Sequence, residues 1–139
     1  MSQAAENKET MRRFVMDCQS AGDLDLIDEL IAPGFVNHAE VPGLPTGREG
    51  VKVLFGAFHH CFEGFHAVIH DQVAEADKVL TRKTFHGRHA NEFMGVPASG
   101  NEVAWDVIDI VRLEDGKLVE HWNVVDQFGL LRQIGALPG

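Results

Sequence analysis

The sequence predicts an α+β fold in which a cone-shaped, curved antiparallel sheet wraps around helices from the N-terminal half. Two observations predict it: helical periodicity dominates the chain before residue 64, and period-two alternation with β-branched residues dominates after it. The length of 139 residues and the 45% of apolar residues are typical of one folded domain, so we expect a single domain over residues 1–139. A sheet curled around one long helix leaves a concave mouth, where ligand sites are favoured.

Three helices are expected before the sheet. The first, over residues 7–20, follows from apolar residues at positions i, i+3, i+4 and i+7. Asp23 then offers its carboxylate as the N-cap of a short second helix that Pro33 ends, and these two helices form a hairpin. In the third helix, Thr46 and Glu49 have the spacing of a capping box ahead of an apolar stripe.

Five strands are expected, the last four of them in a meander. A brief strand over residues 34–39 is followed by a loop rich in proline and glycine. Ala76-Asp77 and Asp115-Gly116 supply tight turns, and the second pair is a strong signal for a type I′ hairpin. The long strands are expected at residues 65–76, 78–89, 101–114 and 117–126.

Charge and composition exclude several classes of partner. The chain has 12 Lys plus Arg against 21 Asp plus Glu, for a net charge of −9, and a surface of that sign repels nucleic acid and anionic lipid. The N-terminus lacks the apolar run of a signal peptide, and no apolar stretch is long enough to span a membrane. We therefore expect a cytoplasmic protein without a nucleic-acid or membrane partner.

Neither a nucleophilic cysteine nor a metal centre is expected. Cys18 and Cys61 lie in helical segments without a CxxC motif and fit small buried hydrophobes, and a disulfide between them stays open as the less common alternative. The eight histidines lack the HExxH motif, and His66 and His70 share a strand face without a third ligand. Motifs for a serine nucleophile, a P-loop and a dinucleotide site are missing as well, so no cofactor is expected.

Asp126 is a candidate for a catalytic acid or base. On the last predicted strand it shares a face with Trp122, whereas His121 and Asn123 take the opposite face, because side chains alternate along a strand. If the Asp126 face is the concave one, aromatic and aliphatic walls hold the carboxylate in a dry site where it can accept a proton near neutral pH. The alternative is that Asp126 only caps the short C-terminal helix.

Three further residues could reach the pocket. Asp109 is unusual among β-branched neighbours, and it can face a subunit partner, pair with Arg88 or Arg112, or line the pocket. His38 and His89 stand where strands open into loops and could hydrogen-bond a substrate at the mouth of the cone. A surface or core position is the ordinary alternative for each histidine.

Two long motifs carry a family resemblance. They are FHGRHANEFMGVPASGNEV over residues 85–103 and DIVRLEDGKLVEHWNVVDQFGLLRQIG over residues 109–135, and FVNHA and PTGREGVK fit the rest of the chain. The sequence resembles the SnoaL-like polyketide cyclase (ester cyclase) family of the NTF2-like superfamily. This resemblance implies a cone of the cystatin-like α+β barrel type, a pocket at its open end, self-association through the outer sheet face, and neither cofactor nor metal.

The resemblance also assigns roles to individual residues. By its position in the EHW-x-x-x-D motif, Asp126 is implied to be the general acid/base of the aldol cyclases. His89 matches the histidine of a family motif and His38 the first-strand histidine, so both are implied to line the pocket. Arg88 replaces the usual threonine, and residues 97–101 differ from the family pattern, which leaves the substrate open. Without any tyrosine, a donor to the substrate must be His, Trp, Asn, Arg or a protonated carboxyl group.

We therefore expect a lyase of polyketide metabolism that abstracts a proton next to a carbonyl and closes a polyketide-like ester by an intramolecular aldol reaction. Asp126 would remove the proton, and His89 and His38 would bond to the enolate or to the attacked carbonyl. A hydrolase or hydroxylase-type relative acting on another small apolar molecule, and a non-catalytic small-molecule binding protein, are the alternatives. The other expected substrate-binding residues are Asn37, Trp122, Trp105, Phe58, Phe62, Arg88 and Asp109.

Self-association is expected through the outer face of the sheet. Three helices cannot cover both faces, and exposed apolar patches commonly mark interfaces. Ile108, Ile110 and Val125 are expected to contribute to this patch. A homodimer or homotetramer that binds a small apolar carbonyl compound is the resulting expectation.

Overall fold

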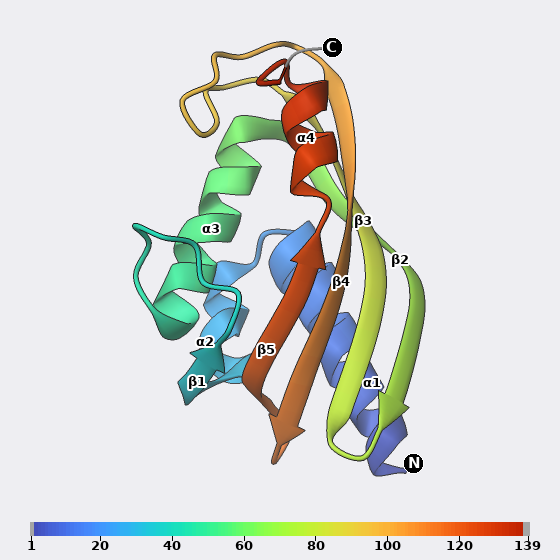
Figure 1. Cartoon of the computed structure of the whole chain (residues 1–139). Helices are drawn as coiled ribbons and strands as arrows, with labels where there is room; N and C mark the ends of the chain where they lie inside the picture. Colours follow the sequence, from blue (N-terminus) through green and yellow to red (C-terminus); the bar gives the residue numbers. More distant parts are fainter. Residues whose placement is uncertain (1, 138–139) are drawn as a thin grey trace.

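The computed structural model describes residues 2–137 and confirms the α+β architecture (Figure 1). Helices and strands follow one another largely in the expected order, with helices first and a meander after them. The elements are α1 (Gln3–Arg13), the π-helix η1 (Phe14–Ser20), the 3₁₀ turn η2 (Leu24–Leu26), α2 (Ile27–Leu30), β1 (Ile31–Asn37), α3 (Gly47–Cys61), β2 (Phe62–Glu75), β3 (Lys78–His89), β4 (Glu102–Glu114), β5 (Lys117–Val125) and α4 (Gln127–Gln133).

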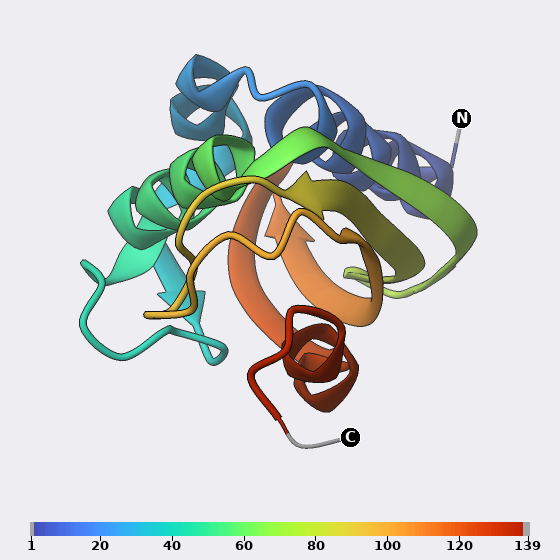
Figure 2. The same ribbon diagram turned by 90° about the horizontal axis from the view of Figure 1, so that it is seen from above.

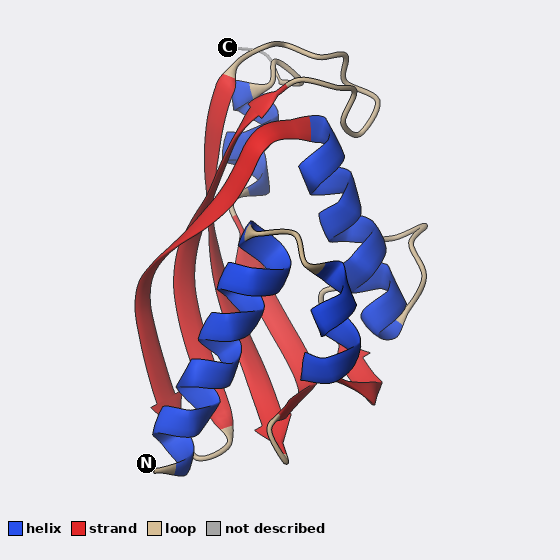
Figure 3. Ribbon diagram, turned by 180° about the vertical axis from the view of Figure 1, so that it is seen from behind, coloured by secondary structure: helices blue, strands red, loops and turns tan. Residues whose placement is uncertain are grey.

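The five strands form one curved sheet in the order β1-β5-β4-β3-β2. Neighbours from β2 to β5 pair antiparallel, and β1 joins β5 in parallel. Helices α1, α2 and α3 lie on the concave side of the sheet (Figure 3), and the view from above shows how the strands curl around the space beside them (Figure 2). Over the described residues the sheet stays unclosed, with β1 and β2 as its edges.

The meander agrees closely with the sequence prediction. The strands β3, β4 and β5 begin and end within one residue of the expected positions, and β2 begins three residues early, directly after α3. Asp115 and Gly116 both have positive φ angles, 51° and 74°, as the type I′ turn requires. Turn chemistry and alternation therefore suffice to place these four strands.

The first strand was expected too late in the chain. It begins at Ile31 rather than Gly34, and the preceding helix consequently ends at Leu30. Pro33 lies inside the strand. Proline has no backbone N–H to donate, and this is tolerated because β1 is an edge strand with one unpaired side. A proline that seemed to end a helix in fact belongs to a strand.

Two expected helix caps are also wrong in detail. Asp23 and Thr46 occupy the N-cap positions, but neither side chain makes a capping hydrogen bond. At α3 the Gly47 N–H donates instead to a carboxylate oxygen of Glu40, 3.1 Å away in the preceding loop. The cap is therefore supplied by a residue that the local S/T-x-x-E pattern does not include.

The end of the first helix is a π-helix. From Phe14 to Ser20 the backbone widens, and the Ala21 N–H bonds to the Met16 carbonyl oxygen, five residues back. A π-helical turn holds an extra residue, which rotates the side chains that follow it, and such turns often lie at functional sites. Phe14 and Gln19 both reach the central cavity from this segment.

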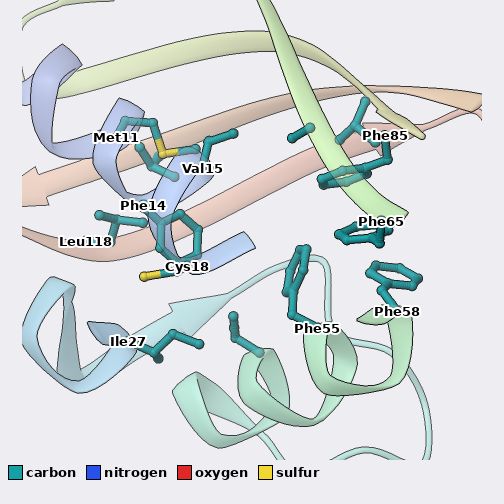
Figure 4. Packing of buried hydrophobic residues seen from close by; sticks show 14 of the residues in the cluster. Met11, Phe14, Val15, Cys18, Ile27, Phe55, Phe58, Phe65, Phe85 and Leu118 are labelled. Atoms are coloured by element: carbon teal, nitrogen blue, oxygen red, sulfur yellow. The ribbon is translucent and has the colours of Figure 1, made fainter. Parts of the chain in front are cut away.

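The core fills the space between the helices and the concave face of the sheet (Figure 4). Met11 and Val15 are buried from the α1 side. Phe65 joins α3 to the sheet, because its ring centroid lies 5.3 Å from that of Phe58 and 5.1 Å from that of Phe85. None of the described helices is long and apolar enough to cross a membrane.

Both cysteines are buried free thiols, as expected. Burial, with the carboxylates of Asp23 and Asp17 nearby, raises the pKa of Cys18 to about 12. Burial also raises the pKa of Cys61, whose thiol donates to the Glu92 carbonyl oxygen at 3.1 Å. Neither thiol is held as the thiolate that nucleophilic chemistry requires.

A glycine pair tests how tightly the sheet packs on the end of α3. A Cβ added to Gly87 on β3 would lie 2.7 Å from the Cβ of Phe62, whereas one added to Gly34 on β1 meets nothing within 4 Å. We expect Gly87→Ala to lower the free energy of unfolding by about 1 to 3 kcal/mol through overpacking, with Gly34→Ala as the matched control. Urea denaturation measures both, and equal midpoints for the two variants would contradict the packing described.

Candidate functional site

A cavity of about 500 Å³ lies between α3 and the concave face of the sheet. Its walls are mainly apolar, as in most small-molecule sites. Two long loops also line it, the first through Ala39, Glu40, Val41, Leu44 and Pro45 and the second through residues 92–94. The aromatic and aliphatic wall residues include Phe35, Val51, Leu54, Phe55, Phe58, Phe85, Trp105 and Val107.

An ion pair lies among these apolar walls. The Lys83 ammonium on β3 lies against Oδ2 of Asp109 on β4, and the two side chains are 1% and 3% exposed. Residues paired across neighbouring strands share a face of the sheet, as do residues two apart on one strand. Lys83 pairs with Val107 and Thr81 pairs with Asp109, so Lys83 and Asp109 both project from the concave face. A charge buried this deeply requires a partner, since its desolvation is not otherwise compensated.

The network continues from Asp109 to His121 and Asn37. His121 Nε2 lies 2.8 Å from Asp109 Oδ1, and His121 Nδ1 lies 2.9 Å from Asn37 Oδ1. The Ala39 N–H donates to the same Asn37 oxygen at 2.9 Å, which fixes the orientation of the amide. Both ring nitrogens of His121 therefore lie within hydrogen-bonding distance of a side-chain oxygen.

Gln19 completes the surroundings of the ammonium. Lys83 Nζ donates to Gln19 Oε1 at 2.7 Å and lies 4.7 Å from the centroid of the Phe85 ring. The π-helix directs Gln19 toward this position, and the Gln19 carbonyl oxygen lies 2.7 Å from His59 Nε2 on α3. Lys83 is thus held by β3, β4 and the end of the first helix.

Burial and charge act in opposite directions on this pair. Burial by itself would raise the pKa of Asp109, but Lys83 and the hydrogen bond from His121 outweigh it and lower that pKa to about 2. Burial lowers the pKa of Lys83, and the Asp109 carboxylate opposes that change. The site holds an ionised carboxylate together with an amine whose charged form is disfavoured by desolvation.

A bulge in β5 determines which residues face the cavity. Leu118 lies opposite Leu113 on the concave side, yet the next pair is Arg112 with Glu120, so Val119 is an extra residue. Simple alternation from Leu118 would direct Trp122 and Asp126 inward. The bulge reverses the alternation after Val119, and the residues of β5 that line the cavity are Leu118, His121, Asn123 and Val125.

Contrary to the expectation from the sequence, Asp126 therefore does not face the cavity. It is exposed at the end of β5, and its Oδ1 accepts the Gly129 N–H at 2.9 Å as the N-cap of α4. The structure agrees with the capping alternative for this residue. Val125 was expected on the outer face but lines the cavity, because the same bulge reverses the alternation of side chains along β5.

His89 is buried rather than placed at the mouth. The side chain is fully enclosed behind Phe62, with 5.7 Å between the ring centroids, and is not among the described residues that line the cavity. The Ser99 N–H donates to His89 Nδ1 at 3.1 Å, and the backbone N–H of His89 donates to the Asn101 carbonyl oxygen. His89 therefore anchors the loop after β3.

Three more expected site residues lie on the convex face. The His38 ring stacks on Trp122 with 5.0 Å between centroids, and its Nε2 lies 2.7 Å from Glu120 Oε2. Arg88 donates to Glu63 at 2.6 Å on the same face. These contacts hold the three side chains away from the concave cavity.

Most of the other residues expected to bind substrate do lie in the cavity. Asn37, Asp109, Phe58 and Trp105 all line the cavity, whereas Phe62 is fully buried behind it. Asp109 pairs with Lys83 rather than with either arginine that the sequence suggested.

Sequence reasoning did not find the residues that surround Asp109 in the cavity or the nearby amide, which are Gln19, Lys83, His121 and Asn123. A lysine at a concave position of a strand was one available signal, because Lys83 alternates in phase with Val79 and Phe85. His121 and Asn123 could be found only by recognising the bulge. Among the described residues, no group of three or more His, Cys, Asp or Glu side chains is placed to hold a metal ion.

Comparison with known proteins agrees with this geometry. Residues 9–134 match the family model of SnoaL-like polyketide cyclases. The chain belongs to the SnoaL-like polyketide cyclase family. The resemblance carried by the two long motifs is thereby confirmed.

Several relatives of this SnoaL-like cyclase come from Streptomyces. It is 27% identical over 118 residues to the nogalonic acid methyl ester cyclase of Streptomyces nogalater, covering 84% of this chain and 88% of that one. It is 33% identical over 127 residues to the aklanonic acid methyl ester cyclase DauD of Streptomyces sp. (strain C5), covering 88% and 78%. The solved structure of TsrD from Streptomyces laurentii superposes with a TM-score of 0.86 at 32% identity, covering 96% and 97%.

The Asp109 interaction makes stability depend on pH. Because the pKa of Asp109 is about 2 in the folded chain against 3.8 ordinarily, its stabilisation is present above pH 3.8 and is lost as the pH falls toward 2. We expect the stability advantage of wild type over Asp109→Asn to shrink by on the order of 2 kcal/mol across that interval. Urea unfolding at several pH values measures it, with Asp25→Asn at an exposed site as the control, and an advantage independent of pH would contradict the ion pair.

Proposed function

We propose that this SnoaL-like cyclase closes a ring in a polyketide-like ester by an intramolecular aldol reaction that uses only side chains of the chain itself. The observation that supports this most directly is the buried group of Lys83, Asp109 and His121 in a mainly apolar cavity. Proton transfer at carbon needs a positioned acid/base and a site that stabilises the resulting negative charge. This group supplies both.

In the proposed reaction, Asp109 and His121 act as one acid/base pair. The Asp109 carboxylate accepts the proton from the carbon next to the substrate carbonyl, while Lys83 and the His121 ring stabilise the enolate. The enolate carbon then attacks the second carbonyl carbon, and the alkoxide takes the proton back from the pair. A carboxylate of low pKa is a weak base, and the Lys83 ammonium and the His121 ring offset that weakness by stabilising the charge that forms.

The cavity suits a flat, mainly apolar molecule with a few carbonyl groups. Phe58 and Trp105 form part of the wall, with 5.6 Å between their ring centroids, and offer aromatic surface to a ring system. Asn123 lines the cavity with an exposed side chain and can donate to a substrate carbonyl. Relatives are named for methyl esters of nogalonic and aklanonic acids, so such esters are the first substrates to test.

Substitution of the pair tests the reaction. We expect Asp109→Asn and His121→Gln each to reduce turnover of aklanonic acid methyl ester by at least about 10²-fold, the usual contribution of a general base. Folding of each variant is checked by urea denaturation at the assay pH. If both variants fold and turn over the ester at the wild-type rate, the pair has no such role.

Asp126→Asn separates this mechanism from the one implied by sequence alone. The amide oxygen can still cap α4, so stability is expected to stay near wild type, and turnover should stay within about twofold because the exposed side chain is outside the cavity. Turnover is measured beside Asp109→Asn. A large loss in Asp126→Asn with none in Asp109→Asn would return the acid/base role to Asp126.

We also propose that the convex face of the sheet joins two copies of the chain. Val124 is 74% exposed and Ile108 is 39% exposed on neighbouring strands, and the register places them opposite each other. Trp122 and Ile110 form the next pair on this face. Such a continuous apolar surface without a covering helix is typical of an interface.

Light scattering tests this association. We expect a dimer or a larger species at micromolar concentration, and we expect Val124→Lys to shift the population toward monomer because it buries a charge at the interface. Val73→Lys, an exposed valine near the far end of β2, is the control for adding a surface charge. A monomeric wild type would contradict the proposal.

A further inference from the structure

We propose that Lys83 is a covalent attachment site for carbonyl compounds, at which its amine condenses with a ketone, and most readily with a 1,3-diketone. This inference goes beyond the proposed aldol reaction, where Lys83 acts only through its charge. It rests on where the amine is held and on which groups surround it.

The first argument is the position of the amine. Lys83 is 1% exposed, and it lines the cavity together with Phe85 and Trp105. The other lysines, Lys8, Lys52, Lys78 and Lys117, are not among the residues that line it. Among the described residues, Lys83 is therefore the one lysine whose amine a molecule in the cavity would meet.

The second argument is that the amine can lose its proton where it stands. Gln19 Oε1 accepts a hydrogen bond from Nζ at 2.7 Å, and Asp109 Oδ2 is the adjacent carboxylate. Burial disfavours the charged form of the amine, and Oδ2 of Asp109, a carboxylate at rest, can accept the Nζ proton transiently and return it during the reaction. A lysine desolvated in an apolar pocket is a common amine nucleophile.

The third argument is that the condensation balances with these groups. Nζ attacks the carbonyl carbon and forms an N–C bond, while the π electron pair moves to the oxygen, which takes the proton from Asp109. A second proton, released by the nitrogen, lets this oxygen leave as water. With a 1,3-diketone, loss of a proton from the central carbon then gives a conjugated enaminone, so that one amine and one diketone yield the enaminone and one water.

Pentane-2,4-dione is a suitable probe because it is small and its enaminone absorbs in the near ultraviolet. We expect one adduct per chain at neutral pH, with a mass gain of the dione minus one water, and peptide mapping should place it on Lys83. Labelling of Lys83 should be at least about tenfold faster than that of Lys78 on the same strand, since burial favours the free amine of Lys83 and the cavity holds the dione beside it. No adduct on Lys83, or faster labelling of the surface lysines, would overturn the inference.

Variants keep the test independent of folding and of the aldol reaction. Lys83→Met with Asp109→Asn removes the ion pair as a unit, which proteins often tolerate, and should abolish the fast adduct, whereas Lys78→Met should keep it. In Asp109→Asn alone, the amine loses the counter-charge that favours its protonated form, and solvent can carry the proton that Asp109 relays in wild type, so labelling should persist even though turnover is lost. Labelling of Lys83 with unchanged turnover in Asp109→Asn would sustain the covalent site and defeat the proposed acid/base pair.

Discussion

The ion pair between Lys83 and Asp109 is the constraint on which the rest of the cavity depends. An unpaired charge at either position would be strongly destabilising, because both side chains are almost fully buried and bulk water does not solvate them. The pair needs further hydrogen bonds to satisfy its remaining donors and acceptors, and the chain supplies and orients them from three different elements. Gln19 comes from the first helix and His121 from β5, while Asn37 holds His121 from the end of β1. Elements far apart in sequence are thereby fixed to one point.

Two irregularities of the backbone make this convergence possible. The π-helix turns Gln19 toward Lys83, and the bulge at Val119 turns His121 toward Asp109. A regular α-helix and a regular strand would each direct another residue to the same place. Local departures from ideal geometry commonly lie next to functional sites for this reason.

Sequence patterns predict the fold well and the site in part. Alternation and turn residues are sufficient for β3 to β5, since each strand carries its own period and the Asp115-Gly116 turn fixes a hairpin. The same alternation fails for Asp126, because one extra residue inverts the faces of β5 and nothing local to Val119 announces it. Lys83 was missed for a different reason: its partner Asp109 is 26 positions away, and only the sheet register brings the two together. Pairings of this kind depend on tertiary structure rather than on local propensity.

The residues that line the cavity come partly from helices and strands and partly from loops. Lys83, Asp109 and His121 stand on strands and Gln19 on the π-helix, whereas two stretches that also line the cavity, one within residues 39–45 and one at residues 92–94, belong to loops. Loops accept insertions and substitutions that strands in a paired sheet do not. Variants of this chain could therefore exchange one set of molecules for another by altering only these two stretches, with the reactive groups left in place. In a directed-evolution experiment, a small library that varies only these two loops would therefore be suited to selecting new substrates.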